Sequence, residues 1–273
     1  MPYFEHKGLL FYYIDTGHGM PFIFQHGLGG SVDQILKIYT PLPGVRLISF
    51  DFRGHGKTPM GITEQLNFKT FSDDILALLD HLHVNQAVVG GISMGAGVAL
   101  NFALRYAKYV SGMILSRPAW LDGPMENPGR EIFNLMSKLI REYGPDTGRQ
   151  LFMHSDLYIQ LCKDSPVTAQ SFLANFSYEK ASETAVKFES LPADAPSGNR
   201  DEWKKITAPT LILANQSDPV HPFDYGLEYA STMLHADFRE ITSKSTSEEQ
   251  HNKDVQKNID FFITDVLKAQ HDS

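Results

Sequence analysis

Apolar residues in this chain form short uninterrupted runs that alternate with longer segments of helical periodicity. The runs at 21–27, 45–51 and 87–93 are dominated by apolar residues, as expected of strands buried on both faces of a sheet. Residues 70–84 differ, because apolar side chains recur there every three or four positions and so fall on one side of a helix. This alternation predicts parallel strands connected by helices.

The same alternation returns near the end of the chain. The pattern predicts strands at 209–218 and 237–242 and helices at 222–235 and 252–268. The first 17 residues are rich in aromatic side chains and end in a turn, which predicts an antiparallel pair of strands. The predicted fold class is therefore α/β, a mostly parallel, doubly wound sheet of about eight strands with helices on both faces.

Between these two regions the strand pattern stops. Residues 122–200 contain helical segments and no convincing strand. One helix is predicted to begin after Asn127, a suitable N-cap followed by proline, and to end at Gly144, which is also followed by proline. Ser165, again before a proline, predicts the start of another helix.

This interruption predicts two structural units. We expect residues 1–121 and 201–273 to form the α/β core, and residues 122–200 to form a helical cap. Because the insertion follows a strand's C-terminal end, it should lie over the crevice in which doubly wound sheets bind ligands.

Composition limits the classes of function. The 273 residues carry a net charge of −8 with a pI near 5.7, which disfavours a nucleic-acid groove because such a groove needs a basic face. No apolar stretch approaches the roughly 20 residues of a membrane span, and no secretory signal is evident. The single cysteine, Cys162, indicates a reducing compartment. We expect a cytoplasmic monomer or homodimer that binds neither nucleic acid nor membrane.

Candidate chemistry centres on the segment GGISMGAG at 90–97. It contains the pattern G-x-S-x-G around Ser93, placed between a predicted strand and a predicted helix. A sharp turn of this kind raises a serine hydroxyl at the edge of the sheet, and Gly91 and Gly95 leave room for the chain to turn. A tight glycine-rich turn or a phosphate loop are the alternatives, but the phosphate-loop patterns are missing. We interpret Ser93 as a nucleophile.

A serine nucleophile needs a base and an acid that orients the base. Asp218 follows a predicted strand and is the expected acid, with Asp122 as a second possibility. His251 lies in a polar segment before the last predicted helix and is the expected base. We considered His221 a poor base because it follows Asp218 by only three residues, and His235 is better explained by helix capping.

Two backbone amides are expected to stabilise the developing oxyanion. One belongs to Met94, directly after the nucleophile at the start of a helix, and the other to Leu28 in the glycine-rich segment HGLGG. His26 in that segment is interpreted as structural. No histidine, cysteine or acidic cluster has convincing metal-ligand spacing, so we expect neither a metal nor a cofactor.

These stretches together resemble the α/β-hydrolase family, in its branch of esterases, lactonases and carbon–carbon hydrolases that carry a cap. The matching segments, in the family's order, are HGLGG at 26–30, DFRGHGKT at 51–58, GISMG at 91–95, NQSDPV at 215–220 and His251. The resemblance implies a triad of Ser93, Asp218 and His251 and an oxyanion hole of Leu28 and Met94. It also implies that DFRGHG is a structural loop. Gln250 stands where the family often has glycine.

The expected activity is hydrolysis of a small to medium carboxylic ester through an acyl-enzyme. The alternatives are a lactonase or carbon–carbon hydrolase of aromatic degradation, or a ligand receptor with this fold and slow turnover. Trp120 and Arg117 follow the same predicted strand and are candidates for the substrate pocket. Arg117 could bind a substrate carboxylate, or it could form an internal salt bridge.

Overall fold

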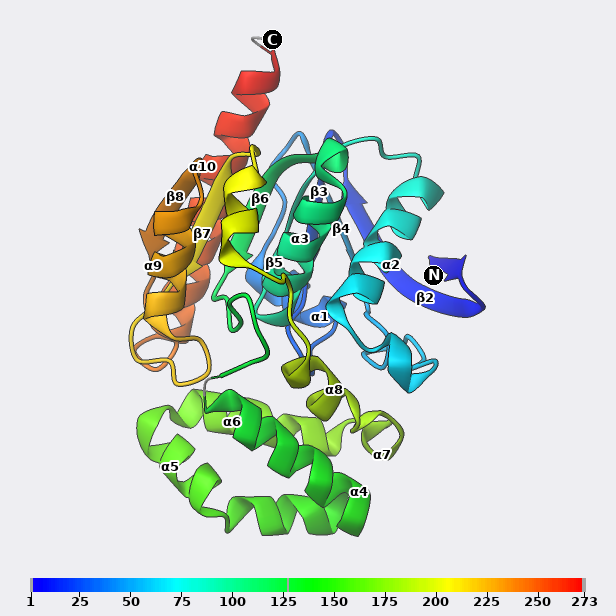
Figure 1. Cartoon of the computed structure of the whole chain (residues 1–273), viewed down its shortest axis with the longest axis vertical. Coiled ribbons are helices and arrows are strands. Elements are labelled where there is room, and N and C mark those ends of the chain that lie inside the picture. Colours follow the sequence, from blue (N-terminus) through cyan, green and yellow to red (C-terminus); the bar gives the residue numbers. More distant parts are fainter. Residues whose placement is uncertain (1, 127, 272–273) are drawn as a thin grey trace.

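The strands of the described residues, which are 2–126 and 128–271 of this computed structural model, form one mixed sheet. They are β1 (Tyr3–His6), β2 (Leu9–Gly17), β3 (Met20–Gln25), β4 (Val45–Phe50), β5 (Ala87–Ile92), β6 (Val110–Ser116), β7 (Thr210–Ala214) and β8 (Ala236–Glu240). Their order across the sheet is β1-β2-β4-β3-β5-β6-β7-β8. β2 is antiparallel to both of its neighbours and all other pairs are parallel, which confirms the predicted fold class (Figure 1).

Helices cover both faces of this sheet. The core helices are α1 (Val32–Ile38), α2 (Phe68–His81), α3 (Met94–Arg105), α9 (Phe223–Thr232) and α10 (Glu248–His271). Adjacent strand residues point to opposite faces: Val89 packs in the cluster formed with α2 and α3, and Val88 in the cluster formed with α1 and α10. Both valines are fully buried. Burial on two faces explains why the strands are continuously apolar in the sequence.

The order of the strands determines where a ligand can bind. After β3 the chain passes through α1 to β4 on one side, and after β4 it passes through α2 to β5 on the other side of β3. Strand order therefore reverses between β3 and β5, and the crevice beyond their carboxyl ends is the usual binding place in such sheets. The predicted loops HGLGG and GISMG both lie at this point.

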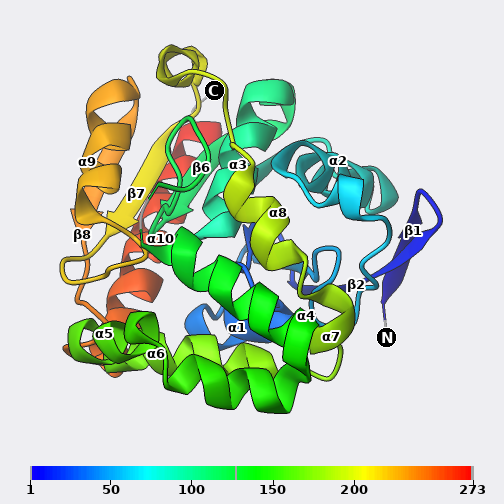
Figure 2. The same cartoon turned by 60° about the horizontal axis from the view of Figure 1, so that its bottom comes forward.

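A helical cap lies across this end of the sheet (Figures 1 and 2). Its helices are α4 (Gly129–Met153), α5 (Asp156–Asp164), α6 (Pro166–Ala174), α7 (Ala181–Thr184) and α8 (Lys187–Ala193). Gly144 has a φ of 75° and interrupts α4, as predicted, although a second helical stretch continues to Met153. Ser165 caps α6 as predicted, and Asn127 lies outside the described residues. Short 3₁₀ helices occur as η1 (Thr63–Gln65), η2 (Ala107–Tyr109), η3 (Asn175–Ser177) and η4 (Arg200–Lys205).

Several polar contacts fasten the cap to the core. The buried Lys187 Nζ donates to the Gly54 carbonyl at 2.6 Å, and the Tyr178 hydroxyl donates to the Gly56 carbonyl at 2.8 Å. Ser165 Oγ lies 2.7 Å from Ser245 Oγ on the opposite side of the cap. The cap is therefore held at both of its ends, above the loops that follow β4 and β8.

The last helix differs from its predicted extent. α10 begins at Glu248, four residues before the predicted start at 252. Ser247 Oγ accepts a hydrogen bond from the Gln250 amide at 3.2 Å, so the polar segment starts the helix instead of forming a loop. His251 consequently lies in the first turn of α10. Among the described residues, no helix combines the length and the apolar character that crossing a membrane requires.

Candidate active site

Ser93 sits in a sharp turn between β5 and α3. Its backbone has a φ of 56° and a ψ of −111°, a conformation that non-glycine residues rarely adopt. A Cβ atom on Gly91 would lie 2.4 Å from the Gly95 carbonyl carbon, and one on Gly95 would lie 2.4 Å from the Gln25 carbonyl oxygen. Both glycines are therefore required by close backbone contact, as the sequence predicted.

The loop after β3 lies against this turn. Gly27 and Leu28 line the same cavity as Ser93. The Gly27 amide donates to Gln34 Oε1 at 2.8 Å and the Gly30 amide to the Gly27 carbonyl at 2.9 Å, which fixes the course of the loop. Met94 is the first residue of α3, where the amide of a helix has no intrahelical acceptor. The main chain at Leu28 and Met94 therefore flanks Ser93.

Two neighbouring side chains brace this loop. Asp51 accepts hydrogen bonds from the amides of Val32 and Lys57, each at 2.8 Å. His26 is fully buried, with Nδ1 2.8 Å from the Gly27 carbonyl, and its Nε2 accepts from the Phe52 amide at 3.1 Å. Burial lowers the pKa of His26 to about 4, so the ring stays neutral at pH 7. These contacts agree with the structural roles predicted for DFRGHG and for His26.

Asp218 pairs with His221. The Asp218 Oδ2 atom lies 2.9 Å from His221 Nδ1, while its Oδ1 accepts from the amides of Val220 and His221 at 3.1 and 3.2 Å. Burial opposes ionisation of this carboxyl, but His221 and Arg117 beside it hold the pKa of Asp218 below its usual value. The turn that starts at Asp218 thus supplies both an ionised acid and an imidazole.

His251 has a different environment from the one predicted. Its Nδ1 lies 2.8 Å from the Thr242 carbonyl, and this residue of the first turn of α10 is buried. No hydrogen bond joins it to Asp218 or to Ser93 within the described residues. Burial lowers the pKa of His251 to about 3. The structure therefore pairs Asp218 with the histidine that the sequence analysis had set aside, and not with His251.

The cavity at Ser93 is small and has mixed walls. Its volume is about 120 Å³. An apolar cavity of about 150 Å³ is enough for benzene, so a short acyl or lactone group is the size that fits. The walls are Gly27, Leu28, Gln34, Ile92, Ser93, Arg117, Phe133, Val167, Thr168, Ser171, Phe172, Asn175, Val220, His221 and Lys244. Five core loops, which follow β3, β5, β6, β7 and β8, therefore contribute to it together with α4, α6 and η3 of the cap.

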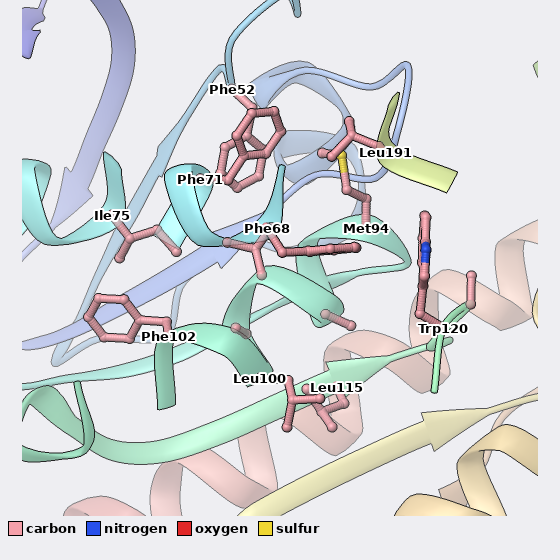
Figure 3. Close-up of a cluster of buried hydrophobic side chains, with 14 of the residues drawn as sticks. Phe52, Phe68, Phe71, Ile75, Met94, Leu100, Phe102, Leu115, Trp120 and Leu191 are labelled. Atoms are coloured by element: carbon pink, nitrogen blue, oxygen red, sulfur yellow. The ribbon is translucent and has the colours of Figure 1, made fainter. Parts of the chain in front are cut away.

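The two pocket candidates that follow β6, Arg117 and Trp120, have different environments in the structure. Arg117 lines the cavity, as predicted, and its Nη1 lies 3.4 Å from Asp218 Oδ2. The prediction for Trp120 does not hold, because its indole is 1% exposed and packs edge-on against Phe68 at 5.2 Å. Figure 3 shows Trp120 in the hydrophobic cluster that also contains Phe68, Met94 and Leu191. Asp122, the other candidate acid, pairs with Arg200 at 2.8 Å.

Sequence reasoning set His221 aside and missed Lys244, which both line the cavity. A turn beginning at an aspartate brings the residue three positions later back to the carboxylate, so the segment Asp218-Pro-Val-His221 carried the signal. The sequence Ser247-Glu-Glu-Gln250 matches a capping box and predicts the early start of α10, which leaves Lys244 in the loop.

Comparison with known proteins agrees with this architecture. The chain belongs to the alpha/beta hydrolase fold family, whose model matches residues 20–244. It is 30% identical over 226 residues to the AB hydrolase superfamily protein YisY of Bacillus subtilis (strain 168), covering 78% of this chain and 80% of that protein. It is 25% identical to a 2-hydroxy-6-oxo-6-phenylhexa-2,4-dienoate hydrolase of Comamonas testosteroni, covering 80% and 78%.

Among solved structures, a thermophilic esterase from Thermogutta terrifontis with malate bound has the same fold. It superposes with a TM-score of 0.71 at 21% identity, covering 96% of each chain. The esterase, like this chain, is therefore matched over nearly its full length.

Proposed function

We propose that this protein is a serine hydrolase that cleaves a small carboxylic ester or lactone through an acyl-enzyme. Ser93 would be the nucleophile, His221 the general base and Asp218 the residue that orients the base. The observation that carries the proposal is the 2.9 Å contact between Asp218 and His221 at the wall of the cavity that contains Ser93.

The protonation of His221 suits this role. A carboxylate can only accept a hydrogen bond, so Nδ1 carries the proton and Nε2 is left as a proton acceptor. Burial lowers the pKa of His221 from 6.5, and Arg117 and Lys244 act in the same direction, against Asp218. The imidazole is therefore neutral at pH 7, as a general base must be.

The reaction would follow from this arrangement in two steps. Ser93 Oγ attacks the acyl carbon while His221 Nε2 accepts its proton, and the oxyanion is stabilised by the amides of Leu28 and Met94. His221 then protonates the leaving alkoxide, which gives a free alcohol and the acyl-serine. A water molecule, deprotonated by His221, hydrolyses the acyl-serine and releases the carboxylic acid.

The small cavity favours an ester or lactone with a short acyl group over a long-chain substrate. Carbon–carbon cleavage, the alternative that the sequence left open, is the second candidate; one relative is a 2-hydroxy-6-oxo-6-phenylhexa-2,4-dienoate hydrolase by its name. A receptor with slow turnover is the third. Steady turnover of p-nitrophenyl acetate and butyrate would support the ester hydrolase, whereas a single slow burst would favour the receptor.

The first prediction concerns the nucleophile and the base. Ser93→Ala is expected to lower kcat by about 10⁴-fold or more, and His221→Gln by about 10³-fold or more, because a neutral serine hydroxyl is a poor nucleophile. A fluorophosphonate probe should label Ser93 in the wild type, as intact-protein mass spectrometry would show.

His251→Gln is the matched control for His221→Gln. Among the described residues its ring makes a hydrogen bond to the Thr242 carbonyl alone, so we expect kcat to change by less than about tenfold when the variant is folded. Loss of turnover in the folded His251→Gln variant, with His221→Gln still active, would reassign the base to His251.

A further inference from the structure

The residues that line the proposed site follow one another along the sheet edge in the order of the strands. Following the strands β3, β5, β6, β7 and β8, the loops present Leu28, Ser93, Arg117, His221 and Lys244 to one cavity. Leu28, which supplies one of the proposed oxyanion amides, therefore lies on one side of the serine. Both cations lie on the other side, flanking the base.

Arg117 is held at this place in a strained conformation. Its φ is 48°, and its amide donates to the Leu213 carbonyl of β7 at 2.7 Å. Among the described non-glycine residues with positive φ, Ser93, Arg117 and Ser217 all lie at this end of the sheet. Strained residues cluster at functional sites when the surrounding structure enforces them.

The guanidinium of Arg117 is incompletely satisfied. Its side chain is 9% exposed, and its contact with Asp218 Oδ2 is long at 3.4 Å. Oδ2 makes its shorter contact with His221 at 2.9 Å. The Arg117 Nε atom is buried with no hydrogen-bond partner. A buried donor of this kind costs free energy unless a ligand accepts from it.

Lys244 adds a second cation on the same side. Its side chain is 22% exposed, and its nearest acidic partner, Glu248 Oε1, is 3.8 Å away and largely solvated. Among the described residues that line the cavity, Arg117 and Lys244 carry charge and none is acidic. Beyond the base, the two cations therefore exceed the one nearby carboxylate, Asp218, and leave a net positive charge, although the whole chain has a net charge of −8.

We infer that Arg117 and Lys244 form a subsite for a substrate carboxylate, so that the substrate is a short ester or lactone carrying a second, free carboxylate. This inference rests on the proposed hydrolase function and narrows its substrate class. Arg117 would donate hydrogen bonds to the carboxylate, and Lys244 would contribute a point charge.

Two methyl esters of nearly equal shape test this subsite. Monomethyl succinate carries the carboxylate, and methyl 4-oxopentanoate replaces it with a neutral acetyl group. For the wild type we expect kcat/KM to be at least tenfold higher for monomethyl succinate. Lys244→Met and Arg117→Met should each lower this ratio at least fivefold. Lys253→Met, on the exposed side of α10, should leave it unchanged. A wild-type ratio near one, or a ratio unchanged in Lys244→Met, would overturn the inference.

A binding experiment separates this inference from the proposed function. Ser93→Ala protein is titrated calorimetrically with monomethyl succinate and with methyl 4-oxopentanoate. If the wild type hydrolyses neither ester but Ser93→Ala binds the anion at least tenfold more tightly, the hydrolase proposal fails and the carboxylate subsite stands. If Ser93→Ala shows no preference for the anion, the subsite is disproved whatever the turnover.

Discussion

At the scale of single residues, the turn at Ser93 depends on glycines that admit no side chain. A Cβ on Gly95 would lie 2.4 Å from the Gln25 carbonyl oxygen and 2.8 Å from that of His26. Gly95→Ala must therefore push α3 away from β3, and we expect it to lower the free energy of unfolding by about 1–3 kcal/mol. Turnover of p-nitrophenyl acetate should fall by more than the loss of folded protein explains. The reason is that the loop at 26–30, which carries the proposed oxyanion amide of Leu28, directly follows β3.

Gly123→Ala is the control for this substitution. Nothing lies within 4 Å of a Cβ at that position, so stability should change by less than about 0.5 kcal/mol in urea denaturation. Equal stability of the two variants would show that the close contact at Gly95 relaxes without cost.

The electrostatic setting of His221 gives a second prediction at this scale. Burial lowers the pKa of His221 from 6.5, with Arg117 and Lys244 lowering it further. Because the base must be neutral, the acid limb of the kcat/KM profile should lie below pH 6.5. Lys244→Met removes one cation, so the acid limb should move to higher pH. A movement to lower pH would contradict the assignment of His221 as the base.

At the scale of secondary-structure elements, local patterns predicted most of the fold but not which histidine reaches the site. Strands buried on both faces, such as β5, are continuously apolar, and the turn at Ser93 needs only its own glycines. The position of His251 depended instead on where α10 begins. A start at Glu248 buries His251 under the helix and leaves Lys244 in the loop facing the cavity. The prediction for Trp120 was wrong because the orientation of its side chain depends on packing against Phe68 of α2, which the local sequence does not reveal.

The contact between α8 and the core gives a prediction at this scale. Burial lowers the pKa of Lys187, whose Nζ donates to the Gly54 carbonyl, from 10.5 to about 7. Between pH 7 and 10.5 the unfolded lysine therefore binds more protons than the folded one, so its contribution to stability rises with pH. The free energy of unfolding of the wild type, minus that of Lys187→Met, should increase from pH 7 to pH 9.5.

Lys138, an exposed lysine of α4, provides the control. The baseline is the free energy of unfolding of the wild type minus that of Lys138→Met, measured at the same pH values. A difference for Lys187→Met that follows this baseline would show that the amine of Lys187 remains charged in the folded protein, held by the carbonyl and by the rings of Tyr178 and Phe188, which lie 4.8 and 5.0 Å from it.

At the scale of the whole molecule, buried histidines from separate loops make stability sensitive to acid. Burial lowers the pKa of His26 to about 4, that of His251 to about 3 and that of His55 well below 6.5. When pH falls below 6.5, the unfolded chain takes up protons that the folded chain excludes, so stability falls with pH. Asp74 opposes this trend, because burial raises its pKa to about 6 and the folded state then binds a proton. Three histidines outweigh one carboxyl, so the free energy of unfolding should decrease from pH 7 to pH 5.

In His251→Gln, whose side chain does not titrate, the slope of the free energy of unfolding against pH should be smaller near pH 5 by about one proton, or about 1.4 kcal/mol per pH unit. His18→Gln, in the exposed turn before β3, provides the reference slope for urea denaturation at each pH. If His251→Gln follows that reference, the ring of His251 is protonated in the folded state, and its burial no longer supports the proposal of His221 instead of His251 as the base.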